Sequence, residues 1–374
     1  MLLPSLLVQV LKVQHLYFQT TIHNSITLKY ITMGGKAFST GPSPLFTPRL
    51  SPTLYADLVT HLTTTLQSLY THVSTPPPAP SKSTHGDIDL LVCSPLTTPS
   101  PTLSTLSSLF HAQRTISTAP QSYSLAIPHP DLQDAYVQVD IRVCEDVKDW
   151  QWALFHHAYG DLWNLLGTMI RPWGLTVNDK GLHLRIEEIE SMDRKKSLIF
   201  LSREPGVVCE FLGMEKERLG IDDDGFITGG DGEEGRGFGS MQEMYEMVVE
   251  LRFFRREAYV RDTLKANDRK RMFQRDGYSK FVDEWLVRYK GLGGGKEGLT
   301  REGVKEDCFT SFGVRGEYER RVEEWRLERE ALKVKREGRE ERKRKALEEE
   351  AYADAWIEIL GMGRGTKTVK IGGD

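Results

Sequence analysis

Cysteine is scarce in this sequence. The chain has four cysteines among its 374 residues, and no two of them form a Cys-x-x-Cys pair. Closely paired cysteines are typical of zinc sites and disulfide frameworks, so their scatter indicates a reducing setting without a zinc site. A chain of this length also buries a sufficient core without disulfides. We therefore expect free thiols and an intracellular protein, cytoplasmic or nuclear.

Long apolar runs and an excess of one charge are also missing. The apolar stretch at residues 1–11 is too short to span a membrane, and it lacks the basic start and cleavage site of a signal peptide. The formal net charge of −4 argues against a protein that coats nucleic acid. No Gly-x-Ser-x-Gly elbow and no Walker-type phosphate loop occurs. We expect no membrane partner and no serine-hydrolase or P-loop chemistry.

Hydrophobic periodicity predicts an α+β fold. Apolar residues recur at helical spacing over 54–73, after a Ser51-Pro52 pair that suits a helix N-terminus. Three strand-like runs follow at residues 87–93, 122–128 and 136–144. Further elements are expected as a short helix at 101–111, helices at 149–171, 241–260 and 278–289, a hairpin at 177–184 and a strand at 197–201. Residues 317–350 alternate Glu with Lys and Arg and predict a charged tail helix.

Three aspartates on two of these strands are the candidate catalytic and metal-binding residues. Side chains alternate along a strand, so Asp87 and Asp89 project to the same side. The run Val137 to Val143 alternates strictly, which places Asp140 on the face opposite its valines. Paired carboxylates repel each other unless a cation lies between them, and oxygen ligands suit Mg²⁺ or Mn²⁺. The pattern indicates a metal-bound nucleotide, with Lys82, Ser83 and Gly86 near its phosphates.

These motifs resemble the DNA polymerase beta-like nucleotidyltransferase superfamily. The matching segments are Gly34-Gly35, His85-Gly86-Asp87-Ile88-Asp89 and Val137-Gln138-Val139-Asp140-Ile141. More narrowly, the chain is similar to uncharacterised fungal, phage and viral nucleotidyltransferase-like proteins. That likeness is carried by a Gly-Gly-Lys-Ala-Phe start, Arg49-Leu50 and Gly160 to Gly167. The resemblance implies metal-dependent transfer of a nucleoside monophosphate from a nucleoside triphosphate to a hydroxyl. It does not identify the acceptor, which we expect to be RNA or DNA.

The resemblance also implies residues that bind the substrate. These candidates are Gly34, Gly35, Lys36, Arg49, Lys82, Ser83, His85, Gly86, Asp161 and Asn164. The Gly34-Gly35 turn lies much farther before Asp87 than in most members of the superfamily. The phosphate-binding turn is therefore either Gly34-Gly35 or Ser83-Thr84-His85-Gly86. Asp161 and Asn164 lie one helical turn apart, and either bind the base or ribose or brace the break at Gly160.

Four segments are expected along the chain. An N-terminal extension (1–32) precedes a nucleotidyltransferase-like catalytic domain with a mixed β-sheet (33–190). A mostly helical domain (191–290) and a Gly-rich linker with the charged tail (291–374) follow. Two alternatives to the enzyme remain open: a catalytically silent member of the fold that binds nucleic acid or protein, and a phosphodiesterase using the same carboxylates. His156-His157 with Asp161 is a weak metal pattern, because adjacent histidines point to different sides of a helix.

Overall fold

The computed structural model describes residues 35–222, 225, 227, 237–260, 262, 269, 272, 274–291 and 293–361. Gly34 and the N-terminal extension lie outside the described residues. The chain forms two compact units. The first runs up to Arg185 and resumes over Phe200–Phe312, and the second joins Ile186–Ile199 to the chain that follows Phe312. The domain boundaries expected from the sequence stay predictions.

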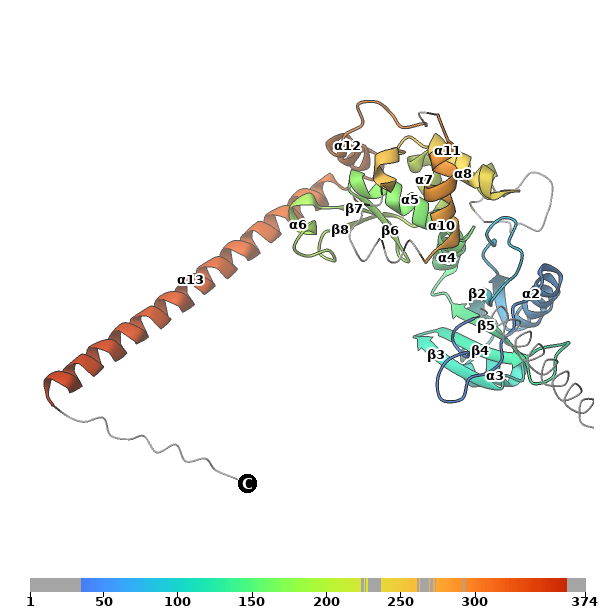
Figure 1. Ribbon diagram of the computed structural model, residues 1–374, viewed down its shortest axis with the longest axis horizontal. Coiled ribbons are helices and arrows are strands. Elements are labelled where there is room, and N and C mark those ends of the chain that lie inside the picture. Colours follow the sequence, from blue (N-terminus) through green and yellow to red (C-terminus); the bar gives the residue numbers. More distant parts are fainter. Residues whose placement is uncertain are drawn as a thin grey trace, which may run out of the picture. The chain divides into compact units, whose positions relative to one another are not determined.

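A five-stranded mixed sheet carries the candidate catalytic residues (Figure 1). Its strands are β1 (Tyr70–Ser74), β2 (Ile88–Pro95), β3 (Arg114–Ala119), β4 (Ser122–Pro128) and β5 (Tyr136–Val143). Their order is β1-β2-β5-β4-β3, in which β2 and β5 run parallel and the other neighbours antiparallel. The expected α+β class with a mixed sheet is thus confirmed.

One face of this sheet is covered by helices α2 (Pro52–Leu66) and α3 (Leu103–Leu109). Their buried leucines pack with the apolar positions of the strands in one core, which includes Leu62, Leu106, Ile88, Leu90 and Val139. Each fully buried side chain of this size contributes about 2 kcal/mol. Because residues alternate between the faces, the polar positions of β2 and β5 are left on the opposite face.

The helix expected at 54–73 is wrong in its second half. Helix α2 ends at Leu66, and Tyr70–Ser74 is the edge strand β1. Leu69 and Val73 continue the helical spacing of α2, but Val73 pairs with Val92 of β2. The buried Tyr70 packs in the core between the sheet and its covering helices. Tertiary pairing has overridden the local pattern here. The predicted helix start is confirmed, since the Ser51 side chain accepts a hydrogen bond from the Leu54 amide at 3.3 Å.

The rest of the first unit is mostly helical. Its helices include α4 (Val147–His157), α5 (Leu162–Ile170), α7 (Pro205–Leu212), α8 (Met241–Glu250), α10 (Asp276–Lys280), α11 (Leu286–Arg288) and α12 (Arg301–Phe312). Strands β6 (Leu175–Asn178) and β7 (Gly181–Arg185) form the predicted hairpin, and β8 (Leu198–Ser202) completes a three-stranded sheet in the order β6-β7-β8. The helix expected at 241–260 ends early at Glu250, and the Phe253 carbonyl accepts a hydrogen bond from Trp173. All four cysteines are free and buried.

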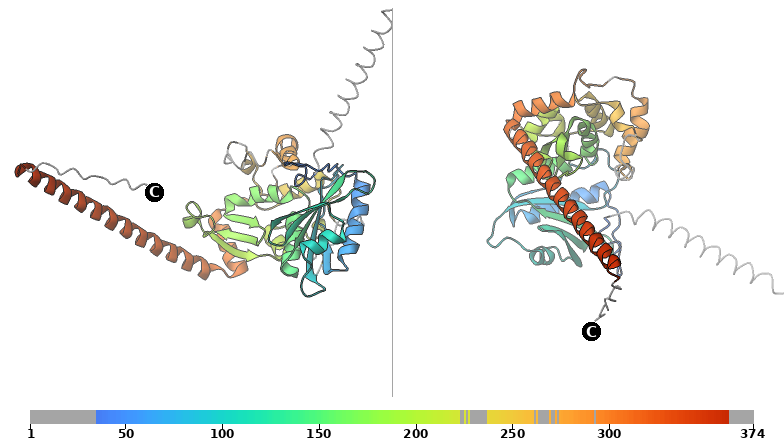
Figure 2. Two further views of the ribbon diagram at one scale, coloured as in Figure 1. Left: turned by 90° about the horizontal axis from the view of Figure 1, so that it is seen from below. Right: turned by 90° about the vertical axis from the view of Figure 1, so that its left-hand side faces the viewer.

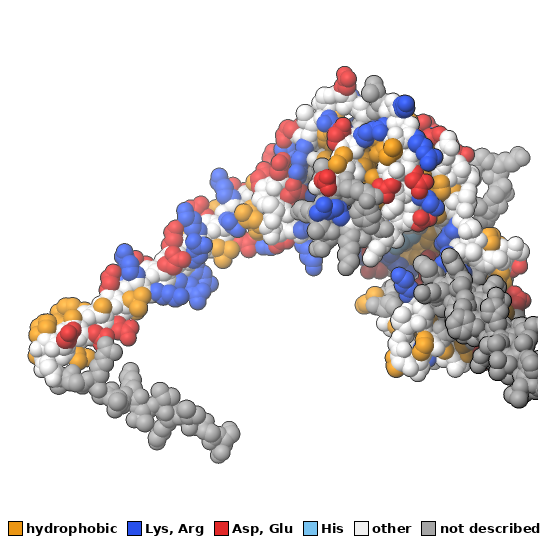
Figure 3. All heavy atoms as spheres, viewed as in Figure 1, with side chains coloured by type: hydrophobic (Ala, Val, Ile, Leu, Met, Phe, Trp, Pro, Cys, Tyr) orange, Lys and Arg blue, Asp and Glu red, His pale blue; other side chains and the backbone are white. Residues whose placement is uncertain are grey.

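The second unit contains the short helix α6 (Glu187–Glu190) and the 45-residue helix α13 (Arg315–Ile359), which runs without a break (Figure 2). Acidic and basic side chains alternate along α13, with hydrophobic side chains gathered near its far end (Figure 3). The predicted charged tail helix is confirmed. Among the described helices, none is long and apolar enough to cross a membrane.

Candidate active site on the acidic face of the sheet

The parallel pairing of β2 with β5 brings two of the three aspartates together. Asp89 is the register partner of Asp140. Asp87 lies one residue before β2, and two residues before Asp89, so alternation directs both side chains to the same face. Neighbouring Ile88 and Val139 belong to the core on the opposite face. The geometry of two strands therefore gathers acidic groups that are distant in the sequence.

The two paired aspartates open into a cavity of about 370 Å³. The cavity walls come from β2, β4 and β5, from the segments around Ala37 and Pro76, and from the end of α4. Its lining residues are Ala37, Pro76, Asp89, Leu90, Leu91, Ser122, Tyr123, Ser124, Gln138, Asp140, Ile141, Arg142 and His157. A cavity with two carboxylates in its lining is able to hold a cation together with a solute that carries several oxygen atoms.

Crowding of the carboxylates changes their ionisation. The Asp89 side chain is exposed at the cavity. Desolvation by the protein around that cavity, together with the charges of Asp87 and Asp140, raises the pKa of Asp89 to about 7. Burial also raises the pKa of Asp140, and the nearby Ser124 hydroxyl and Gln138 amide partly offset that rise. These shifts arise because like charges in a poorly hydrated site disfavour full ionisation.

The unsatisfied hydrogen-bonding capacity of Asp140 fits a cation. Its Oδ2 accepts a hydrogen bond of 2.7 Å from Gln138 Nε2, whereas Oδ1 is buried and has no hydrogen-bond partner. A buried carboxylate oxygen without a partner is costly, and a hard divalent ion would satisfy it. The three carboxylates do not converge as tightly as preformed ligands, because among the described residues only His156, His157 and Asp179 bring ligand atoms within 4.8 Å of one another.

The Gly34-Gly35 turn lies beside the acidic strand although the sequence separates them. Of this turn, Gly35 is described, and its amide donates to the Gly86 carbonyl at 2.7 Å. The amide of Ala37 donates to Gln138 Oε1 at 3.0 Å. A Cβ atom on Gly35 would lie 2.3 Å from that same Oε1, so a side chain cannot fit without displacing Gln138. Folding therefore brings the two alternative phosphate-binding segments next to each other.

The segment before Gly86 is held by Arg49. Its Nε donates to Thr84 Oγ1 at 2.7 Å, and Nη2 donates to the Thr84 carbonyl at 2.8 Å. Lys82 and Ser83 are exposed, and the positive charge of Lys82 lowers the pKa of Asp89, opposing the larger shift upward. Lys82 thus lies within electrostatic reach of the carboxylates, as a phosphate-binding cation must. Lys36 is exposed on the Gly35 turn.

Three other predicted substrate residues have structural partners. His85 is buried and stacks on Tyr55 with 3.7 Å between ring centroids, and burial with the nearby cations lowers the pKa of His85 to about 4. Asp161 accepts hydrogen bonds from Arg275 Nη1 at 3.1 Å and from the Tyr278 amide at 3.3 Å. The Asn164 side chain is 3.4 Å from Asp161. None of the three lines the cavity. The same holds for the other described candidates, and the substrate roles of all of them stay predictions: Gly35, Lys36, Arg49, Lys82, Ser83 and Gly86.

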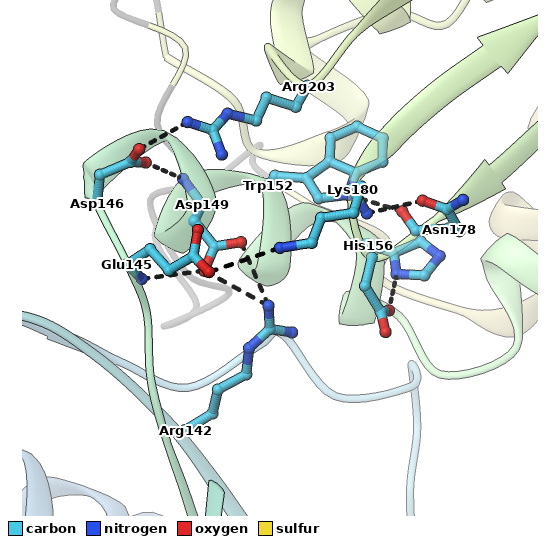
Figure 4. Close-up of polar contacts among 10 residues, drawn as sticks. Arg142, Glu145, Asp146, Asp149, Trp152, His156, Asn178, Lys180 and Arg203 are labelled. Carbon is cyan, nitrogen blue, oxygen red and sulfur yellow. Dashed lines mark hydrogen bonds and ion pairs between the residues drawn. The ribbon is translucent and has the colours of Figure 1, made fainter. Parts of the chain in front are cut away.

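Several residues of the cavity wall are not among the site residues predicted from the sequence. Arg142 shares the face of Asp140 by strand alternation, and its guanidinium donates to Asp149 of α4 at 3.3 Å (Figure 4). Ser124 is the register partner of Asp140 on β4. The alternation of β5 was a usable signal for Arg142. No local signal exists for His157, because it reaches the cavity from the end of α4.

Comparisons with known proteins give little further guidance. No protein-family description and no curated protein matches the chain. A solved structure, the Leishmania infantum polymerase beta ternary P/T complex, is similar at a TM-score of 0.33 and 16% sequence identity. The similarity covers 45% of this chain and 74% of that one. A likeness this weak carries no argument about function.

Proposed function

We propose that this protein is a nucleotidyltransferase that uses Mg²⁺ or Mn²⁺ to join a nucleoside monophosphate to a hydroxyl acceptor. One observation carries the proposal: Asp89 and Asp140 are register partners on parallel strands, and both line a cavity beside the flanking Asp87. The resemblance of Gly86-Asp87-Ile88-Asp89 to the nucleotidyltransferase motif supports the same reading. The proposed donor is a nucleoside triphosphate, and the proposed acceptor is RNA or DNA.

The residues that would hold the metal are Asp87, Asp89 and Asp140. The buried Asp140 Oδ1 without a hydrogen-bond partner and the raised pKa of Asp89 both fit a site completed by a cation. When bound, such an ion neutralises phosphate charge and favours ionisation of the attacking hydroxyl. No protein nucleophile is required.

In the proposed reaction, side chains of the protein accept the proton of the attacking hydroxyl and neutralise charge on the phosphates. The acceptor oxygen forms a bond to the α-phosphorus while the bond from that phosphorus to the bridging oxygen breaks, and pyrophosphate leaves. Asp140 is the candidate acceptor of the hydroxyl proton, and Gln138 fixes its orientation through the 2.7 Å hydrogen bond. Lys82, exposed near Asp89, is placed to neutralise charge on the triphosphate. The Gly35 turn, whose amide donates to the Gly86 carbonyl, is the candidate phosphate-binding turn.

The decisive experiment measures nucleotide incorporation. The purified chain is incubated with each α-labelled nucleoside triphosphate, Mg²⁺ or Mn²⁺ and a mixture of RNA and DNA oligonucleotides. Asp89→Asn and Asp140→Asn should each lower incorporation by at least about 100-fold, because each removes a charge that holds the metal. Asp57→Asn, an exposed position on α2, is the matched control and should keep full activity.

The other outcomes identify the alternatives. Nucleotide binding that needs no divalent ion, with no incorporation by the unaltered protein, would identify a silent binding module. Cleavage of a phosphodiester without consumption of triphosphate would identify a phosphodiesterase. Either result would contradict the transferase proposal.

A further inference from the structure

A second cluster of metal-binding side chains lies at the end of helix α4. His156, His157 and Asp179 each offer one ligand atom, and these atoms lie within 4.8 Å of one another. The two histidines end α4, and Asp179 lies in the turn between β6 and β7. The cluster therefore bridges two elements of the first unit. We call these three residues the His-His-Asp cluster.

The spacing within the cluster is that of metal ligands. His156 Nδ1 lies 3.4 Å from Asp179 Oδ1. This nitrogen is buried and has no hydrogen-bond partner, so the two atoms lie close together without hydrogen-bond geometry. Two ligands bound at about 2.0 to 2.1 Å from one ion, at a tetrahedral angle, lie about 3.3 Å apart. An ion between these two atoms needs little rearrangement of either.

Both sides of the cluster are held in place before any ion binds. Trp152 Nε1 donates to the Asn178 carbonyl at 2.9 Å, which fastens α4 to the hairpin (Figure 4). The His156 ring stacks on Trp152 with 5.8 Å between centroids and 9° between planes. Asn178 Oδ1 accepts from the Lys180 amide at 2.7 Å and so shapes the turn that carries Asp179. Ligands fixed by their neighbours lose little freedom when a metal binds.

The charges around the cluster permit a cation. Besides His156, a member of the cluster, Arg142 acts electrostatically on both His157 and Asp179. Its guanidinium forms an ion pair with Asp149 at 3.3 Å, which balances that positive charge. Asp179 itself supplies a carboxylate that is 67% exposed and so is open to an ion from solution.

We infer that the His-His-Asp cluster binds a divalent transition-metal ion, with Zn²⁺ the best match. Two imidazole nitrogens and one carboxylate oxygen suit Zn²⁺, whereas Mg²⁺ prefers oxygen ligands. Three protein ligands leave a fourth position for water or a solute oxygen. Because His157 also lines the cavity that contains Asp89 and Asp140, the ion would stand at the edge of that cavity. The inference does not rest on the proposed transfer reaction.

This site differs from the expectation drawn from the sequence, which was an intracellular protein without a zinc site. That expectation came from the spacing of the cysteines, which take no part in the cluster. The pattern considered for His156-His157 paired them with Asp161, whereas the structure pairs them with Asp179. The two histidines differ in exposure: His156 is half-buried and His157 is exposed.

The test is direct binding of Zn²⁺ to the full chain, without a histidine tag and with excess Mg²⁺ to occupy oxygen-only sites. A competition titration against a chromogenic chelator should show one tight Zn²⁺ per chain. His157→Ala and Asp179→Ala, both at exposed positions, should weaken that binding by at least about 100-fold. Asp57→Ala, at an exposed position on α2, is the control and should bind as the unaltered protein does.

Three further results complete the design. Circular dichroism must show the same helix content in every variant, and His156→Ala serves as a third ligand test. Co²⁺ in place of Zn²⁺ should give the visible absorption of a site with nitrogen ligands, and the signal should disappear in His157→Ala. Absence of tight Zn²⁺ binding by the unaltered chain would overturn the inference. So would equal binding by His157→Ala and Asp179→Ala. Neither outcome bears on nucleotide incorporation, which is measured separately.

Discussion

The five-stranded sheet and helix α13 obtain their structure in opposite ways. The sheet is fixed by contacts between residues distant in the sequence, such as the pairing of Asp89 with Asp140. Helix α13 has 45 residues, of which only Tyr318 is buried, and its charged side chains form ion pairs three or four residues apart. Long-range contacts position a site, whereas local pairs support a helix.

The largest expected contrast is in the cost of removing an apolar side chain. Leu90 is fully buried in β2, and Leu332 on α13 is 57% exposed. Leu90→Ala should lower the free energy of unfolding by about 3 kcal/mol through lost burial and a cavity, and Leu332→Ala by less than about 0.5 kcal/mol. Urea denaturation followed by tryptophan fluorescence measures both. Similar costs for the two variants would contradict the comparison.

The next effect concerns Gln138, whose side chain bonds both the Asp140 carboxylate and the amide of Ala37 in the Gly35 turn. Gln138→Leu removes the hydrogen bonds to Asp140 and to the Ala37 amide. If the chain is a nucleotidyltransferase, incorporation should fall about 10- to 100-fold, as it does when the partner of a metal ligand is lost. Gln133→Leu, at an exposed position, is the control. An unchanged rate would show that the orientation of Asp140 does not depend on Gln138.

A smaller effect is expected from the ionisation of Asp89. Its folded-state pKa, about 7, lies above its ordinary value of 3.8, so the folded protein binds an extra proton between these values. Proton binding by Asp89 therefore stabilises the folded protein. This stabilisation is complete below about pH 4 and is lost as the pH rises through 7. Asp89→Asn should therefore become more stable relative to the unaltered chain from pH 5 to 8, by about 1 kcal/mol after allowance for solvent screening.

Denaturation series at several pH values in a chelator measure this difference. Mg²⁺ should reduce this difference in stability, because a cation bound to the unaltered chain favours the ionised Asp89 carboxylate. A difference between the two proteins that does not change with pH would mean that Asp89 ionises normally.

The smallest effect should come from the tail. Arg344 forms ion pairs with Glu341 at 2.8 Å and Glu348 at 3.7 Å, all on exposed side chains of α13. Arg344→Ala should change helix stability by only about 0.3 to 0.5 kcal/mol. Ellipticity at several salt concentrations measures the change, and salt should diminish it because exposed pairs are screened. A loss of stability as large as that expected for Leu90→Ala would show that Arg344 has interaction partners outside its own helix.

Much of the fold could be predicted where local pattern and tertiary structure agree. Strand β4 has the predicted limits, and β5 differs by one residue at its end. The prediction failed at Tyr70–Ser74, where helical spacing continued although the backbone pairs with β2. Strand β3 and helix α12 were not predicted, because each lies where the sequence offers weak periodicity. A short edge strand is defined mainly by its neighbour, which no local pattern contains.

The sequence by itself determined that Asp89 and Asp140 point away from their neighbours Ile88 and Val139, and therefore avoid the core that those two residues enter. This followed from the two-residue period of a strand, which is a property of the local backbone. Only the tertiary structure decided that β2 and β5 are parallel neighbours in this register, that Gly35 meets Gly86, and that Asp179 reaches the histidines of α4. Such contacts depend on how the chain closes its loops and packs its core, and no single segment encodes them.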